Sequence, residues 1–500
     1  MREKREGMFK KVLVANRGEI AVRIVRACCD LGIAAVAVYE PDDIGALHVR
    51  LANEAYALSR PGSYRNPDEM LAVARHAGVD AVHPGYGLIS EHPGFVRACE
   101  DAGIVVIGPG SAVLEQVRNK IGAVAQVRAA GIATTYPSSR AFAPDEGAAM
   151  LVEADTIGFP LVVKAHAGGH GRGTHIVRDR DSLMSVVLRS SGAAQAFYGD
   201  AHIYLEAAMA TSRYIEVPVL GDNYGTIIHL GERDGSIQRN TRKVIGESPA
   251  PGISQAQREA IWQTALHVAH IFGIRGAATV EFVVDDAGQH HFTEIKPRIQ
   301  VEHLATEMIT RIDLVREQLR IAAGERLGYT QDQVRLSGVA MFCRINAEDP
   351  WHGYLPSPGH ITSFRTPGGP NVRVDTYAYA GATVPVHYDS LLAKLGVWGA
   401  TREECLNRVQ RALQEFQISG VRTNLGLLRL IVNDEEFVTG TYTTESSQRP
   451  LMDAPPPDDN LGDLAAVVAL AFLSRIQSAR PSTPPVFTGG WYRDSRKLPS

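Results

Sequence analysis

The sequence predicts an α/β protein with a parallel sheet at its N-terminus and a β-rich region near its C-terminus. Between residues 11 and 107, short apolar runs alternate with amphipathic stretches of helical length. This alternation implies a parallel sheet with helices on its faces. From residue 338 to 395 the pattern changes to β-type segments separated by Pro- and Gly-containing turns. With 500 residues, 45 % of them hydrophobic, the chain is long enough for about three or four globular domains.

The N-terminal region is expected to form the parallel sheet. Strands are predicted at 11–15, 33–39, 81–83 and 104–107, and helices at about 16–31, 67–76 and 91–102. The loop His-Pro-Gly-Tyr-Gly at 83–87 follows the third of these strands. Open α/β sheets bind ligands at the carboxyl ends of their strands, so this loop is a candidate for ligand contact. A rigid loop that only closes the fold is the alternative.

A glycine-rich segment at 163–173 lies after a long helix, predicted at 111–130, that contains Lys120. The segment leaves one strand and enters another at about 174–177. Glycine lets backbone N–H groups approach phosphate closely, so a mobile flap over phosphates is one interpretation. The spacing matches neither the Rossmann nor the Walker pattern. A flexible hairpin without a phosphate-binding role is therefore the alternative interpretation.

The remaining chain mixes both element types. Strands are predicted at 204–206, 215–220 and 226–232, and helical segments at 255–272, 301–323, 403–415 and 425–430. After residue 446 the composition changes. A Pro-rich linker is expected at 455–459, a helix at 461–478 and coil at 482–500 around Trp491.

A predicted hairpin brings two carboxylates together. Val-Glu-Phe-Val at 280–283 and His-Phe-Thr-Glu at 291–294 are typical of short strands, and the Asp-Asp-Ala-Gly between them has turn chemistry. Glu281 and Glu294 can then lie on neighbouring strands, where they repel unless a cation separates them. Magnesium bound with nucleotide phosphates is the usual cation, and Arg298 follows with a planar fork suited to carboxylate, bicarbonate or phosphate. A solvated surface hairpin is the alternative.

Composition excludes several classes of protein. The net charge of −4 gives no sign of nucleic-acid binding. There is no apolar run long enough to span a membrane, and the first residues lack an apolar signal core, so we expect a cytoplasmic protein. The five cysteines include no CxxC pair, which favours reduced and mostly buried thiols.

Several motifs occur together in one order along the chain. They are Asn-Arg-Gly-Glu at 16–19, His-Pro-Gly-Tyr-Gly at 83–87, the glycine-rich segment at 163–173, Arg-Ile-Gln-Val-Glu-His at 298–303 and Arg-Ile-Asn-Ala-Glu-Asp-Pro at 344–350. With these motifs, the chain from about residue 9 to about residue 445 resembles the biotin carboxylase component or domain of biotin-dependent carboxylases, which has an ATP-grasp fold.

The resemblance implies a domain organisation. An N-terminal biotin carboxylase domain with a Rossmann-like parallel sheet would occupy residues 9–120. An ATP-grasp domain would follow at 121–330, with a mobile lid at about 136–210. A β-rich C-terminal biotin carboxylase domain would occupy 337–445, and a Pro-rich linker, helix and tail would occupy 446–500.

The resemblance also implies a reaction. ATP and bicarbonate would give carboxyphosphate and ADP, and carbon dioxide from carboxyphosphate would carboxylate N1 of biotin. Glu302 matches the general base of the family, and Arg344 matches the arginine that stabilises the biotin enolate. A base, cations on crowded phosphates and an arginine on an oxyanion form a coherent set for this chemistry.

The other site residues are carried over in the same way. The bicarbonate pocket would comprise Lys243, Arg298, Gln300 and Val301, and the ligands of Mg²⁺, or of Mn²⁺ in its place, would be Glu281 and Glu294. The nucleotide would contact Lys120, Lys164, Gly168, Gly169, Gly171, Glu206 and Gln238, and Tyr86 lies in the loop that lines the biotin pocket.

The nucleotide side departs from the family pattern. Lys296 stands where the family has asparagine, and a charged lysine cannot ligate magnesium, although its ammonium could replace part of a second ion's charge. His170 interrupts a run of glycines, Ala207 replaces a lysine expected to contact adenine, and Tyr214 and Thr241 each replace a histidine. We therefore expect an altered nucleotide site beside an intact carboxyphosphate and biotin side.

Partners follow from the same resemblance. The chain contains no Ala-Met-Lys-Met biotinylation motif, so the biotin carrier and the carboxyltransferase are expected on separate chains. A homodimer is expected through surfaces that include the first helix, with Arg26 and Asp30 on one face; an intrahelical salt bridge is the alternative. A biotin-independent ligase acting on another nucleophile and a regulatory homologue without ATP turnover remain alternative functions.

Overall fold

A computed structural model describes residues 7–166, 174–209, 212–239, 242–446 and 468–473. The chain divides into two compact units, Met1–Asp453 and Ala454–Ser500. In the second unit, the described residues 468–473 are helical. The predicted linker, the coil around Trp491 and the rest of the 461–478 helix lie outside the described residues. All elements below belong to the first unit.

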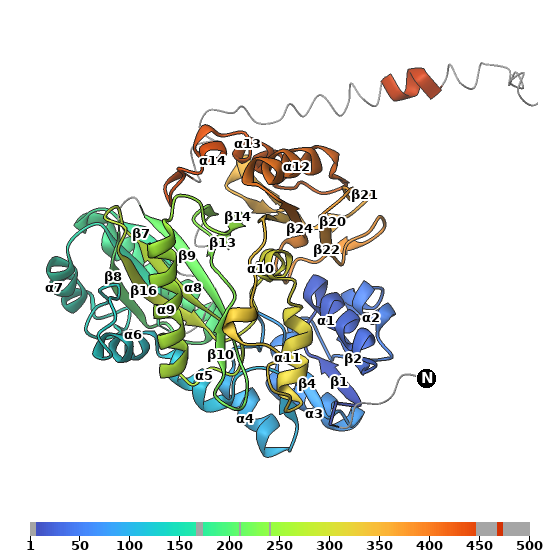
Figure 1. The fold of residues 1–500 in the computed structure, drawn as a ribbon, viewed down its shortest axis with the longest axis horizontal. Helices are drawn as coiled ribbons and strands as arrows, with labels where there is room; N and C mark the ends of the chain where they lie inside the picture. The colour runs from blue at the N-terminus through green and yellow to red at the C-terminus, as the bar shows by residue number, and fades with distance from the viewer. Residues whose placement is uncertain (1–6, 167–173, 210–211, 240–241, 447–467, 474–500) are drawn as a thin grey trace, which may run out of the picture. The chain divides into compact units, whose positions relative to one another are not determined.

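A parallel sheet opens the first unit, as predicted, but it has a fifth strand, at residues 54–57, that was not predicted (Figure 1). Its strands lie side by side in the order β3 (Glu54–Ala57), β2 (Ala34–Tyr39), β1 (Lys11–Val14), β4 (Ala81–His83) and β5 (Val105–Val106), and its helices are α1 (Gly18–Leu31), α2 (Leu47–Leu51), α3 (Pro67–Ala77) and α4 (Pro93–Asp101). Val12 and Val14 pack in one cluster with α1, whereas Leu13 packs in another with α3 and α4. Both faces of the sheet are therefore buried, which explains its continuous apolar strands.

The single helix predicted at 111–130 is wrong, because the chain forms α5 (Ser111–Arg118) and α6 (Lys120–Ala129). Between them, the Asn119 side chain accepts a hydrogen bond from the Gly122 backbone N–H. An asparagine in this capping role begins a new helix rather than continuing the old one. The break puts Lys120 at the first residue of α6.

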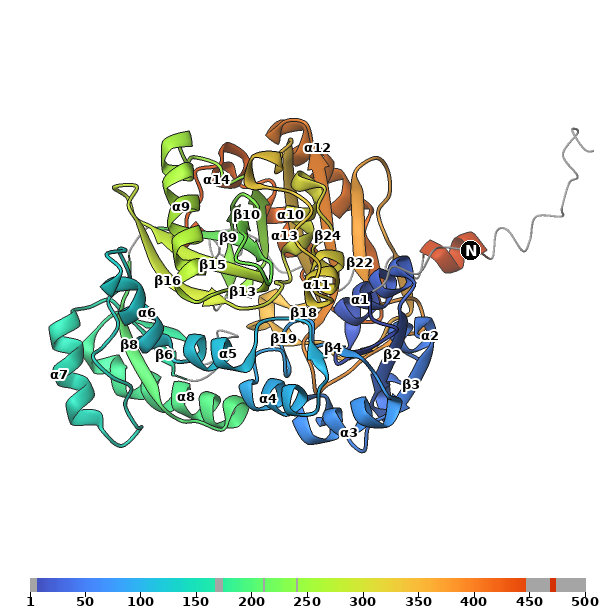
Figure 2. The same cartoon turned by 60° about the horizontal axis from the view of Figure 1, so that its bottom comes forward.

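A small antiparallel sheet lies within the segment predicted as a lid. Its order is β7 (His175–Val177), β6 (Leu161–Ala165) and β8 (Ile203–Ala207). Figure 2 shows α7 (Gly147–Ile157) and α8 (Arg180–Tyr198) beside it. Neither helix was predicted; α8 contains Ser-Ser-Gly at 190–192, which lowers helix propensity, and forms because its apolar side chains pack on the small sheet.

A large antiparallel sheet joins the central and C-terminal parts of the chain. Its main path is β16 (His290–Lys296), β15 (Gly276–Val284), β9 (Arg213–Gly221), β11 (Arg233–Asp234), β14 (Ile245–Ser248), β17 (Val339–Asn346), β24 (Leu391–Gly399) and β22 (Val372–Thr376), with β10 (Ile227–His229) paired to β9. The two-stranded pairs are β12 (Gln238–Arg239) with β13 (Arg242–Lys243), β18 (Glu348–Asp349) with β19 (Leu355–Pro356), β20 (Gly359–His360) with β23 (Thr383–Val384), and β21 (Ser363–Arg365) with β25 (Gln417–Ser419).

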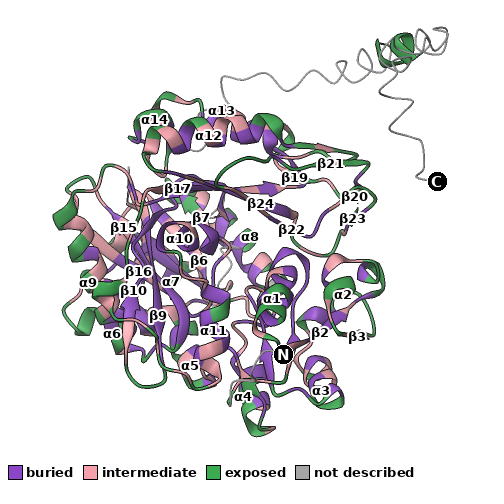
Figure 3. Cartoon of the chain, turned by 45° about the vertical axis from the view of Figure 1, so that its right-hand side comes forward, coloured by how far each residue is buried: buried purple, intermediate pink, exposed green. Residues whose placement is uncertain are grey.

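Helices cover this sheet. They are α9 (Gln255–Ile271), α10 (His303–Thr310), α11 (Leu314–Ala322), α12 (Arg402–Glu415), α13 (Leu425–Ile431) and α14 (Glu435–Thr439). Figure 3 shows buried strands β17 and β24 next to α12, whose outer face is exposed. The sheet thereby forms a rigid support for side chains that project from β9, β15, β16 and β17.

Two expectations from composition agree with the fold. No helix in the described part of the chain has both the length and the apolar character that crossing a membrane requires. All five cysteines are free thiols, and only Cys29 is exposed.

Candidate active site

Three glutamates lie in one row across neighbouring strands. Glu281 on β15 is directly opposite Glu294 on β16, so the predicted hairpin pairing is confirmed. On its other side, Glu281 is opposite Glu216 of β9. Directly opposite residues share a face of the sheet, and carboxylates this close repel one another unless cations intervene.

Lysines provide these cations. The Lys243 ammonium is 3.2 Å from Glu281 Oε1 and also pairs with Glu216. The Lys296 ammonium is 2.7 Å from Glu294 Oε2, and that of Lys120 is 3.4 Å from the same oxygen. Burial opposes ionisation of Glu294, but the lysines outweigh it and hold its pKa well below the usual range. Glu294 is therefore ionised and its charge is compensated, whereas burial, opposed by Lys243 and Lys296, raises the pKa of Glu281.

Neutral donors complete the environment of Glu281. The Gln300 amide donates to Oε1 at 2.5 Å, and the Tyr214 hydroxyl donates to Oε2. Burial, followed by the nearby carboxylates, raises the pKa of the Tyr214 hydroxyl well above its ordinary value, so it stays protonated as a donor. Tyr214 thus contacts one of the two carboxylates that the sequence assigns to metal.

A buried arginine that sequence reasoning missed orients this group. Arg233 donates to Glu216 Oε2 at 3.2 Å, to Thr306 Oγ1 at 2.8 Å and to the side-chain carbonyl oxygen of Gln300. It is 1 % exposed, so these bonds satisfy a cation that has almost no access to water. The local sequence, Leu-Gly-Glu-Arg-Asp at 230–234, gives no signal that this arginine is buried.

Glu302 and Arg344 meet although they are far apart in sequence. Glu302 precedes α10, and Arg344 projects from β17; their side chains form an ion pair. Burial opposes ionisation of Glu302, but Arg344, Lys243 and Arg233 outweigh it and lower its pKa to about 2. The carboxylate is charged at neutral pH and is a weak base while Arg344 holds it.

The Arg298 side chain is held in place by two hydrogen bonds. Its Nε donates to Glu91 Oε1 at 2.6 Å, and Nη1 donates to the Ile299 carbonyl at 3.1 Å. Glu91 was not singled out from the sequence, since it is about two hundred residues away along the chain. The bond fixes the direction of a guanidinium that is available for an anion.

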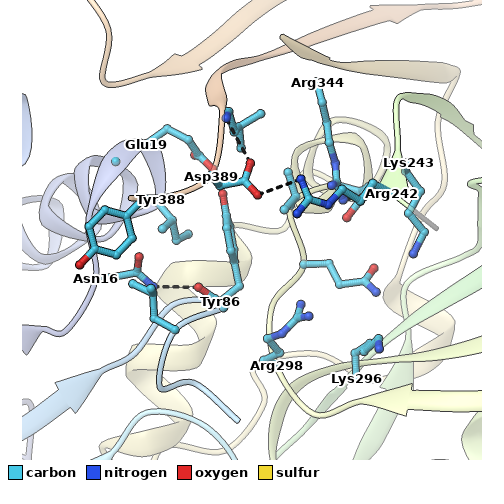
Figure 4. A pocket seen from close by; sticks show the side chains of 18 of the residues that line it. Asn16, Glu19, Tyr86, Arg242, Lys243, Lys296, Arg298, Arg344, Tyr388 and Asp389 are labelled. Atoms are coloured by element: carbon cyan, nitrogen blue, oxygen red, sulfur yellow. Dashed lines mark hydrogen bonds and ion pairs between the residues drawn. The ribbon is translucent and has the colours of Figure 1, made fainter. Parts of the chain in front are cut away.

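Most of these side chains line one cavity (Figure 4). The predicted site residues that line it are Tyr86, Lys120, Lys164, Gln238, Lys243, Glu281, Glu294, Arg298, Gln300, Val301, Glu302 and Arg344. Glu206 is not in the lining but accepts a hydrogen bond from the Lys164 ammonium at 2.5 Å. Gly168, Gly169 and Gly171 lie outside the described residues, as do His170 and Thr241.

The cavity continues past Glu302 toward the N-terminal sheet. There, Asn16 donates to the backbone carbonyls of Pro84 at 2.7 Å and Tyr86 at 2.8 Å, which holds the loop that carries Tyr86. Gly85 in this loop has φ 63°, and a Cβ on it would lie 3.0 Å from Asn16 Nδ2 and from Ile20. The motif at 16–19 therefore positions this end of the cavity, a role the sequence did not specify.

The arrangement suits an anionic, phosphate-bearing substrate. Lys120, Lys164, Lys243, Lys296 and Arg298 line the cavity together, and Glu302 provides a carboxylate among them. In the described part of the chain, no group of three or more His, Cys, Asp or Glu is arranged to hold a metal ion. Two carboxylates on neighbouring strands, those of Glu281 and Glu294, are a donor set that fits a magnesium ion whose other ligands are phosphate and water.

Comparisons with known proteins agree with this chemistry. Three family models match: "Biotin carboxylase, N-terminal domain" at 8–114, "Carbamoyl-phosphate synthase L chain, ATP binding domain" at 120–330 and "Biotin carboxylase C-terminal domain" at 342–448. A biotin carboxylase of Nostoc sp. is 44 % identical over 443 residues, covering 88 % of this chain and 99 % of the relative. Biotin carboxylase 1 of Bacillus subtilis is 41 % identical, covering 88 % of this chain and 98 % of the relative.

Solved structures agree as well. The biotin carboxylase domain dimer of 2-oxoglutarate carboxylase from Hydrogenobacter thermophilus, in complex with MgADP, ADP and bicarbonate, matches with a TM-score of 0.86 and 40 % identity over 90 % of this chain and 99 % of that chain. Biotin carboxylase of Campylobacter jejuni matches with a TM-score of 0.84 and 36 % identity over 89 % and 99 %.

The fold and the site define an ATP-grasp ligase. Within that class, the chain belongs to the biotin carboxylase family.

Proposed function

We propose that the chain carboxylates carrier-bound biotin with ATP and bicarbonate, through carboxyphosphate. The observation that supports this best is one cavity in which Glu302, Arg344, Lys243 and Arg298 lie beside the Glu281–Glu294 pair. Incubation with MgATP, radiolabelled bicarbonate and free biotin tests it. Acid-labile label on biotin is expected, and label on no acceptor would contradict the proposal.

Each residue has a proposed task. Lys120 and Lys164 bind phosphates, and Arg298, Lys243, Gln300 and Val301 hold bicarbonate. Glu302 takes the bicarbonate proton so that the anion can attack the terminal phosphate. Arg344 then stabilises the negative oxygen of the acceptor, beside Tyr86. Mg²⁺, when bound by Glu281 and Glu294, would neutralise phosphate charge.

The ion pair of Arg344 with Glu302 links the activation of bicarbonate to the carboxylation of the acceptor. While paired, Glu302 has a pKa of about 2. When an acceptor oxygen draws Arg344 away, one favourable charge is lost and the pKa of Glu302 rises toward the range of an effective base. Acceptor binding therefore promotes deprotonation of bicarbonate.

Two alternatives rest on particular residues. A ligase acting on another nucleophile would keep the carboxyphosphate machinery and change only the acceptor end near Tyr86. A regulatory homologue would be favoured by the replacements Ala207 and Tyr214 on the nucleotide side. The retained set of Glu302, Arg344 and Lys243 supports the enzyme.

The proposed assembly has further parts. Following the resemblance, we divide the chain into domains at 9–120, 121–330 and 337–445, followed by a Pro-rich linker, helix and tail at 446–500. The carrier protein and the carboxyltransferase are separate chains in this proposal. We place the protein in the cytoplasm.

Mg-ATP binding is expected to be weakened but measurable. Ala207, at the end of β8, cannot make the charged contact that a lysine would, and one such contact is worth about 1.5–3 kcal/mol, or roughly ten- to a hundredfold in affinity. Ala207→Lys is expected to tighten binding by that factor in calorimetric titration, whereas Ala208→Lys should not. Tight, micromolar-or-better binding by the unmodified chain would show that the replacements compensate.

A homodimer is expected at micromolar concentration. Arg26 is exposed on α1, where a charged side chain is available to a second copy of the chain. Arg26→Glu should shift sedimentation toward the monomer, and Arg316→Glu on the exposed face of α11 should not. An unmodified chain that sediments only as monomer would defeat the expectation.

A further inference from the structure

Lys296 places a fixed positive charge in the row of acids. It follows Glu294 by two residues on β16, so both side chains project from the same face of the strand. Its ammonium is 2.7 Å from Glu294 Oε2, and the residue is 7 % exposed. The lysine of this ion pair is buried in the cavity wall, unlike an exposed lysine that is free to swing into solvent.

The ammonium is charged at neutral pH. A lysine amine is protonated at neutral pH, and the Glu294 carboxylate at 2.7 Å favours the charged form. A protonated amine has no lone pair for a metal ion. It therefore contacts the carboxylate that would bind a divalent ion and repels a second ion placed there.

The contacts of Glu281 are a second, independent observation against the binding of two divalent ions. Its Oε1 accepts from Gln300 and faces Lys243, and its Oε2 accepts from the Tyr214 hydroxyl. The protein thus supplies donors to both carboxylates of the pair. Magnesium dehydrates reluctantly and binds through few carboxylates plus phosphate oxygens, so little of this pair is left for two ions.

We propose that Lys296 is a resident cation of the nucleotide site, which pairs with one oxygen of Glu294, Oε2, in place of a second divalent ion and lets the chain bind ADP or ATP with one divalent ion. The inference rests on the proposed function, because it assigns nucleotide phosphates to this cavity. Phosphoryl transfer needs positive charge around the phosphates, and part of that charge is then built into β16.

Counting bound ions tests the inference directly. Mn²⁺ is the probe, and the number bound per chain in the presence of saturating ADP is measured by electron paramagnetic resonance. The unmodified chain should bind one Mn²⁺, Lys296→Asn should bind two, and Lys296→Arg should again bind one. Lys10→Asn, an exposed change, should match the unmodified chain.

A second readout uses ADP affinity without metal. Loss of the ammonium in Lys296→Asn should weaken metal-free ADP binding by about ten- to a hundredfold, and Lys296→Arg should retain most of it. Two Mn²⁺ ions on the unmodified chain would overturn the inference even if no variant folds. A chain that binds one Mn²⁺ with ADP but forms no carboxybiotin would refute the proposed function and leave this inference standing.

Discussion

Glu302→Gln is expected to lower both bicarbonate-dependent ATP hydrolysis and carboxybiotin formation by about two to four powers of ten, the usual effect of losing a general base. The neutral amide keeps the shape of the side chain but cannot take the bicarbonate proton. Glu302 is 1 % exposed and faces Arg344, Lys243 and Arg233, which are cations that cannot substitute as the base.

The control is Glu259→Gln, the same change on the exposed face of α9, which should leave both rates unaltered. ADP release and carboxybiotin are measured in the same samples. A Glu302→Gln variant that keeps either activity at the unmodified rate would remove Glu302 from the role of base.

Arg344→Ala is expected to separate the two activities. Carboxybiotin formation should fall by about two to four powers of ten, because the acceptor loses the donor for its developing oxyanion. Much of the bicarbonate-dependent ATP hydrolysis should survive, because loss of the Arg344 charge raises the pKa of Glu302 from about 2 and makes it a stronger base.

Two measurements check this separation. Single-turnover experiments compare ADP release with carboxybiotin, and Arg316→Ala on the exposed face of α11 is the control. Equal loss of both activities in Arg344→Ala would assign Arg344 to the phosphate step or to the structure of the site. Unaltered carboxylation would exclude it from the acceptor end.

Local pattern was enough to predict parts of this site. The pairing of Glu281 with Glu294 follows from two short strands and a turn between them, all within one hairpin. The parallel sheet at 11–107 follows from alternating elements, since each βα unit is contiguous in sequence. The roles of the motif residues came from family resemblance, since spacing alone left each motif ambiguous.

Other parts depend on contacts distant in sequence. Glu216 joins the acid row only because β9 pairs with β15, which comes much later in the chain, and no local pattern sets that strand order. Three other features also depend on tertiary contacts: the hydrogen bonds of Arg233, the hydrogen bond of Arg298 to Glu91, and the ion pair of Glu302 with Arg344. The break at Asn119 was missed because a capping asparagine inside an amphipathic pattern looks the same as a tolerated polar residue.

In the proposed reaction, one cavity couples the activation of bicarbonate to the presence of biotin. The most direct test measures ADP release by the unmodified chain with MgATP in four conditions: no addition, bicarbonate, biotin, and both. We expect ADP release that requires bicarbonate and is increased by biotin, together with formation of carboxybiotin. ADP release that ignores biotin but responds to another nucleophile, or no release in any condition, would contradict this proposal.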